Sequence, residues 1–147
     1  MDYQFTSASI LLRLLLSDEH YANDSLSNAA ISTSDLKERG FSLDIKELAR
    51  EDVVNTRAES QMANRPQTRF AAYISEFSHG DIISITDNSN NVLFEVIYDP
   101  VDGNDAHACI LCIDKANTKS HYVMARNKLK PALLKNVTKI EDFLFEN

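Results

Sequence analysis

The stretch VLFEVIYDPVDGNDAHACILCID, residues 92–114, decides the fold. It contains two runs, 92–99 and 106–114, that are rich in the apolar side chains typical of strands. Between them, Asp99-Pro100 ends the first strand, and the following DGND sequence predicts an exposed turn. We therefore predict two strands connected by a polar segment, with His107 at the entry to the second strand.

Segments on the N-terminal side extend this pair into a sheet. The sequence TRFAAYISEF, 68–77, alternates as a strand does, and DNSNN, 87–91, is a turn signal ahead of residue 92. We predict an antiparallel sheet built from strands near residues 69–113. The sequence FSLDI, 41–45, predicts an edge or half-buried strand. The apolar run SASILLRLLL, 7–16, fits either a buried strand or a short helix.

Helical patterns flank these strands. They cover 46–64 and 117–136, the second with a cap at Asn117 or Thr118 and an interruption at Pro131. Strands grouped in one region with helices beside them indicate an α+β fold. The expected fold class is therefore α+β, a single domain with a mainly antiparallel sheet flanked by helices.

Chain length and the lack of a linker or internal repeat favour one domain over 1–147. Within it we expect a long polar loop at about 17–34, which is rich in Ser, Asn and Asp. A short C-terminal helix is expected at about 137–146, because Ile140, Phe143 and Leu144 are spaced as on one helical face.

Composition and charge restrict the functional classes. The net charge of −7 argues against a nucleic-acid partner, since phosphate binding needs clustered Lys and Arg. No secretory signal is visible, and the apolar run interrupted by Arg13 is shorter than the roughly 20 residues of a membrane span. We expect a cytoplasmic protein without a membrane partner. The late basic residues fit a solvated helix surface better than a cationic binding face; they are Lys115, Lys119, Arg126, Lys128, Lys130 and Lys135.

The sequence HACILC contains the clearest metal-like pattern. On a strand, however, Cys109 and Cys112 point to opposite faces and do not bind one ion. Registers starting at Asp87 or Asp99 do not match a calcium-binding loop, and three glycines are too few for a phosphate loop or dinucleotide fingerprint. We expect no metal site and no cofactor.

His107 is the strongest candidate for chemistry. It can act as a general base, oriented by Asp102 or Asp105, or it can simply hold the polar turn against the strand. A Ser-His-Asp triad also remains open, because triads assemble in space and not in sequence order.

The chain resembles small uncharacterised bacterial proteins with an early Arg, a Ser-rich segment, an S-[VL]-D strand and a late DP…N-x-A-H-A strand entry. Asp105 departs from that pattern, which has proline there. This resemblance implies a bacterial accessory protein, with a role in defence or in a toxin–antitoxin system. The matching residues are Arg13, Ser27, Phe41, Ser42, Asp44, Asp99, Pro100, Asn104, His107 and Ala108.

An early Arg followed by Ser-rich loops is also similar to small NAD-handling toxin folds of the RES or ADP-ribosyltransferase kind. That resemblance implies that Arg13 and Ser27 hold a dinucleotide.

Two functional hypotheses follow. The first is a non-enzymatic accessory or protein-interaction component of a bacterial multi-protein system, with a protein partner. The second is a small nucleotide- or NAD-dependent enzyme that uses Arg13 and His107. The sequence contains no metal-binding, phosphate-loop or dinucleotide motif, which favours the first hypothesis, that of a protein without catalytic activity. Candidate ligand-binding residues are Ser27, Asp102 and Asn104.

Overall fold

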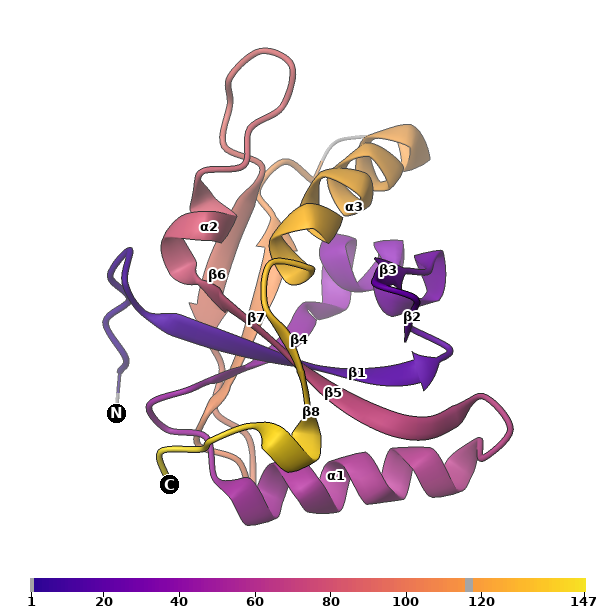
Figure 1. Cartoon of the computed structure of the whole chain (residues 1–147). Coiled ribbons are helices and arrows are strands. Elements are labelled where there is room, and N and C mark those ends of the chain that lie inside the picture. The colour runs from indigo at the N-terminus through magenta and orange to yellow at the C-terminus, as the bar shows by residue number, and fades with distance from the viewer. Residues whose placement is uncertain (1, 116–117) are drawn as a thin grey trace.

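A six-stranded antiparallel sheet forms the centre of the protein (Figure 1). The computed structural model describes residues 2–115 and 118–147, and its strands are ordered β6-β7-β4-β1-β5-β8. The prediction of an α+β fold with a mainly antiparallel sheet is confirmed. The strands are β1 (Ile10–Asp18), β4 (Phe41–Ile45), β5 (Arg69–Ser78), β6 (Phe94–Tyr98), β7 (His107–Cys112) and β8 (Val137–Lys139).

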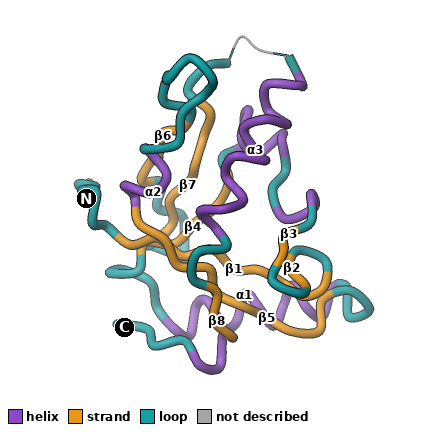
Figure 2. The backbone as a smooth tube through the Cα atoms, turned by 45° about the horizontal axis from the view of Figure 1, so that its top comes forward, coloured by secondary structure: helices purple, strands orange, loops and turns teal. Residues whose placement is uncertain are grey.

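Helices cover both faces of the sheet (Figure 1 and Figure 2). Helix α1 (Glu51–Asn64) packs on one face, while α2 (His79–Ile83) and α3 (Lys119–Leu133) pack on the other. Helix α1 begins later than the sequence pattern suggests, and α3 continues through Pro131 for two residues. Thr118 is the N-cap of α3, and Asn117 lies outside the described residues.

Strand β1 is buried on both faces, which settles the ambiguity of the 7–16 run. Leu11 and Leu15 enter the core under α3, whereas Leu12, Leu14 and Leu16 enter the core under α1. A strand covered on both faces reads as a continuous apolar run without alternation. Strand β4 lies in the interior of the sheet, between β7 and β1, and all of its residues except Ser42 are buried. The prediction of an edge or half-buried strand is therefore wrong.

The expected irregular loop at 17–34 is wrong as well. After β1 the chain forms a hairpin of β2 (Tyr21–Ala22) and β3 (Ser25–Leu26), then a 3-10 turn at Asn28–Ala30. Asn23 and Asp24 have φ of 51° and 60°, the left-handed conformation that a tight hairpin turn requires. Although this segment is mostly polar, its apolar residues Leu26, Ala30 and Ile31 are buried and fix it to the core.

The predicted C-terminal helix at 137–146 is also wrong. Val137 and Thr138 are β-branched and pair with Ser75 and Ile74 of β5, so the segment starts as β8 and continues as the 3-10 turn Ile140–Asp142. The helical spacing is coincidental, because Leu144 is 84% exposed.

Glu19 connects the end of β1 to the start of β5. Its carboxylate accepts hydrogen bonds from Arg69 at 2.7 and 3.0 Å, from Thr68 at 3.0 Å and from Arg65 at 3.2 Å. The bond from Arg69 is the main reason that the pKa of Glu19 falls to about 2. The native protein therefore needs this carboxylate ionised.

We expect stability to decline as the pH falls from about 4.5 towards about 2, because the unfolded chain binds a proton there and the folded chain does not. Glu19→Gln should be less stable at neutral pH and show a shallower loss in acid. Urea unfolding between pH 2 and 6 measures this, with Glu59→Gln on exposed α1 as the control. Parallel profiles for Glu19→Gln and the wild type would contradict the assignment.

Candidate functional site

A cavity of about 450 Å³ lies where α1, β1, β4 and the β6–β7 loop meet. Polar side chains from all of these elements line it, together with His107 at the start of β7. Four of the five residues selected from the sequence are among them: Arg13, Asp102, Asn104 and His107. The cavity is therefore the place where the sequence-derived candidates converge.

Arg13 occupies a gap between two neighbouring strands. Strand β1 pairs with β4 only at Leu11–Ile45 and Leu12–Asp44. Beyond this pairing the Arg13 guanidinium donates from Nη1 to the Ser42 carbonyl at 2.8 Å, and it lies 4.1 Å over the ring of Phe41. The side chain thus takes the place of sheet pairing and stacks on an aromatic face, which guanidinium groups favour.

Arg13 keeps unused hydrogen-bonding capacity. Its Nε is buried and has no hydrogen-bond partner in the described part of the chain. Burial lowers its pKa to about 10, with the charge of Asp35 acting in the opposite direction. A pKa of about 10 still leaves the group cationic at neutral pH.

Asp44 lies on the opposite wall of the cavity and connects the residues around it. It is 4% exposed, and its carboxylate accepts hydrogen bonds from Arg57 of α1 and from Asn104 Nδ2, the latter at 2.7 Å. Asn104 Oδ1 in turn accepts from the Ala106 amide at 3.1 Å. This network fixes the β6–β7 loop and α1 to the same point on β4.

His107 is held at both ring nitrogens. Its Nδ1 is 2.7 Å from the Asp99 carbonyl oxygen, and its Nε2 is 3.1 Å from Ser42 Oγ. A carbonyl only accepts, so Nδ1 carries the proton, and in the neutral ring Nε2 accepts from the Ser42 hydroxyl. The group that orients His107 is therefore Asp99, whose carboxylate is also 3.4 Å from Nδ1. The expectation of Asp102 or Asp105 is wrong.

The sheet register explains why these groups meet. Asp44 is paired with His107, and Ser42 is paired with Cys109, so Ser42 and Asp44 share one face of β4 with His107 beside them. Sequence reasoning missed Ser42, Asp44 and Arg57 as site residues. The alternation within FSLDI is the signal that could have identified the first two, whereas nothing in the α1 sequence distinguishes Arg57 from other surface arginines.

Ser27 is placed elsewhere. It follows β3, its hydroxyl donates to the Glu19 carbonyl at 2.6 Å, and it does not line the cavity. The structure therefore does not bring Arg13 and Ser27 together around this cavity.

Cys109 and Cys112 are free, buried thiols on opposite faces of β7. Burial raises the pKa of both, that of Cys112 to about 11. Across residues 2–115 and 118–147, no three His, Cys, Asp or Glu side chains are grouped to hold a metal ion. None of the helices in these residues is long and apolar enough to cross a membrane.

No protein-family model, curated protein or solved structure matches the chain.

Proposed function

We propose that the cavity binds a small phosphate-bearing ligand of the nucleotide or NAD class, with Arg13 as the anion anchor. The proposal rests on three properties of the Arg13 guanidinium. It lines the cavity, is cationic at neutral pH and has a buried Nε without a partner. Guanidinium groups bind phosphate by charge and by N–H donation.

The charges around the cavity support an anionic ligand. Arg57 is paired with Asp44, whereas Arg13 takes part in none of the ion pairs found among the described residues. The Ser42 carbonyl and the Phe41 ring contact the Arg13 guanidinium, but neither of them carries a negative charge. A phosphate group would supply the missing counter-charge.

Cavity size and polar lining are also appropriate. About 450 Å³ lies within the 300–1,000 Å³ typical of small-molecule pockets. Asn104 and Ser42 offer hydrogen-bonding groups beside Arg13, and His107 offers an imidazole held in one orientation. A few fixed polar groups of this kind orient a ligand and select it.

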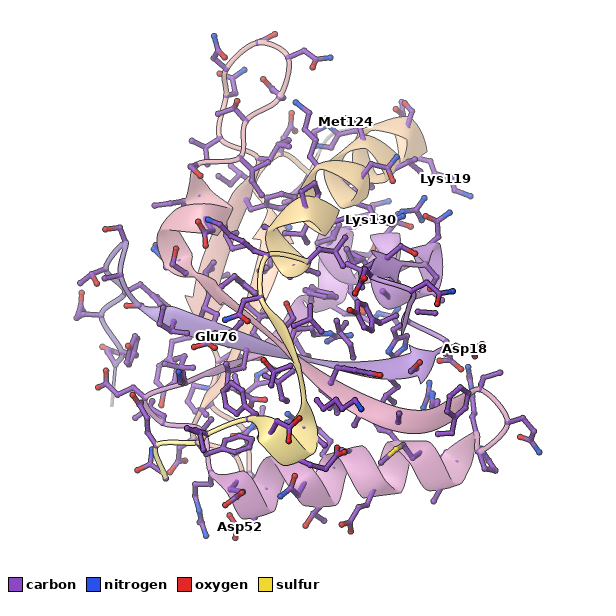
Figure 3. The ribbon with its side chains drawn as sticks, viewed as in Figure 1. Asp18, Asp52, Glu76, Lys119, Met124 and Lys130 are labelled. Carbon is purple, nitrogen blue, oxygen red and sulfur yellow. The ribbon has the colours of Figure 1, made fainter. Side chains whose placement is uncertain are left out.

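Thermal unfolding with NAD, ATP, GTP or inorganic pyrophosphate at millimolar concentration tests the proposal. At least one of them should raise the Tm by about 5 °C, because a ligand at a hundred times its Kd adds about 2.7 kcal/mol to stability. Arg13→Gln should abolish the rise. Lys119→Gln removes the same charge at the start of α3, at the far end of the molecule from the first turn of α1 marked by Asp52 (Figure 3), and should retain it. A wild-type protein that none of the four compounds stabilises would refute the proposal.

We also propose, as a second candidate, a role as a protein-interaction component of a bacterial multi-protein system. Its support is the outer strand β6, at the end of the sheet. Ile97 within β6 is 40% exposed, and Ile113, directly after β7, is 48% exposed. An exposed strand edge with apolar side chains is a common docking surface for another chain. A cytoplasmic location remains part of this proposal.

The test of the second candidate is affinity purification from the native cells. The wild type should recover a stoichiometric partner and Ile97→Lys should lose it. Leu144→Lys, which adds the same charge on the exposed tail, should keep it. Absence of any stoichiometric partner of the wild type would count against this candidate and leave the ligand proposal untouched.

A further inference from the structure

We propose that Ser42 is a nucleophile activated by His107, and that the cavity hydrolyses carboxylic esters of phosphate-bearing compounds. The Ser42–His107 pair stands on its own geometry. The phosphate on the substrate rests on the proposed function, because Arg13 is the group that would bind it.

The direction of proton transfer is set by the hydrogen bonds of His107. The Asp99 carbonyl at 2.7 Å fixes the proton on Nδ1, which leaves the Nε2 lone pair facing Ser42 Oγ at 3.1 Å. A serine hydroxyl within hydrogen-bonding distance of an imidazole, itself oriented by a third group, is the arrangement that produces a serine nucleophile. His107 is therefore the general base and Ser42 the attacking group.

Ser42 is also accessible. It is exposed between Phe41 and Leu43, both buried in the core, and it lies on the cavity wall with His107. The hydroxyl thus faces the space that a substrate would enter, while the strand that carries it is anchored on both sides. Groups held on packed strands keep the geometry that a reaction needs.

Arg13 completes the arrangement. It is bonded to the Ser42 carbonyl at 2.8 Å, so a cationic set of N–H groups lies next to the attacking residue. Such donors stabilise negative charge that develops on an acyl oxygen during attack, and they also bind an anionic group on the substrate. The first effect assists attack on an ester, and the second favours an ester that carries a phosphate.

The reaction follows from these positions. Ser42 Oγ forms a bond to the acyl carbon, its proton passes to Nε2 of His107, and the bond from the acyl carbon to the leaving alcohol oxygen breaks as that oxygen takes the proton. Water then attacks the acyl-serine, gives one proton to Nε2, and Ser42 Oγ leaves and recovers that proton. The products are a carboxylic acid and an alcohol.

A biotin-tagged fluorophosphonate, which reacts with activated serines and loses fluoride, tests the pair directly. Mass spectrometry should place one label on Ser42. Ser42→Ala should remove it, and His107→Gln should slow labelling by at least about 100-fold. Ser27→Ala removes a hydroxyl outside the cavity and should label like the wild type. Circular dichroism and thermal unfolding of each variant confirm that it is folded. A folded wild type without label at Ser42 would overturn the inference.

Inorganic pyrophosphate separates this inference from the proposed function. If both hold, pyrophosphate protects Ser42 from labelling in the wild type but not in Arg13→Gln. Labelling without protection would support the nucleophile and contradict the phosphate site. Stabilisation by pyrophosphate without any labelling would support the phosphate site and overturn the nucleophile.

Discussion

Arg57→Met is expected to lower the free energy of unfolding by about 3 kcal/mol or more, because it leaves the Asp44 carboxylate buried without its cation. Asp44 is 4% exposed, and among the described residues it would retain only the hydrogen bond from Asn104 at 2.7 Å. The Arg57 side chain is partly exposed, so its own loss of packing is small beside the cost of an uncompensated buried charge.

A double-mutant cycle separates the pair from other effects. Asp44→Leu together with Arg57→Met should recover much of the lost stability, since neither charge then remains buried. The exposed pair of Arg50 and Asp52 is the matched control, and Arg50→Met should cost less than about 1 kcal/mol. Equal costs for Arg57→Met and Arg50→Met in urea unfolding would contradict the organising role of Asp44.

Gly40→Ala is expected to cost about 3 kcal/mol, the sum of backbone strain and a steric overlap. Gly40 precedes β4 with φ of 87°, where a side chain is strained. An added Cβ would lie 2.7 Å from Cys109 Sγ and 2.8 Å from Cys109 Cβ. Rotation of the thiol relieves only the first contact, because the Cβ is fixed to strand β7.

Gly103→Ala isolates the strain part of this cost. Gly103 has φ of 81°, close to that of Gly40, but an added Cβ there meets no atom of the described residues within 4 Å. This variant should lose only the strain, about 1–2 kcal/mol. The difference between the two variants in urea unfolding gives the overlap with Cys109. Equal losses would show that β4 and β7 do not pack as closely as the structure has them.

Local sequence patterns predicted several strands of the sheet but not strand β8 at its edge. Strands β5, β6 and β7 follow from β-prone runs bounded by turn residues. The C-terminal segment was predicted wrongly because spacing alone does not reveal that β5 offers an edge for pairing. Long-range pairing overrides local pattern in such segments.

The candidate site was partly visible in the sequence. Arg13 stands out as a charge within an apolar run, and His107 as a histidine at a strand entry. Ser42 and Asp44 become site residues only through the pairing of β4 with β7, which joins segments about 65 positions apart, as the separation of Ser42 and His107 shows. No spacing rule within one segment contains that information.

A titration of the ¹⁵N-labelled protein with inorganic pyrophosphate, followed by amide chemical shifts, tests whether the cavity lined by Arg13 and His107 binds a ligand. We expect saturable shifts at Arg13, Ser42, Gly103 and Asn104 in the wild type, and no shift at Ser42, Gly103 or Asn104 in Arg13→Gln. Shifts confined to other surfaces, or no saturable shift at millimolar pyrophosphate, would contradict it.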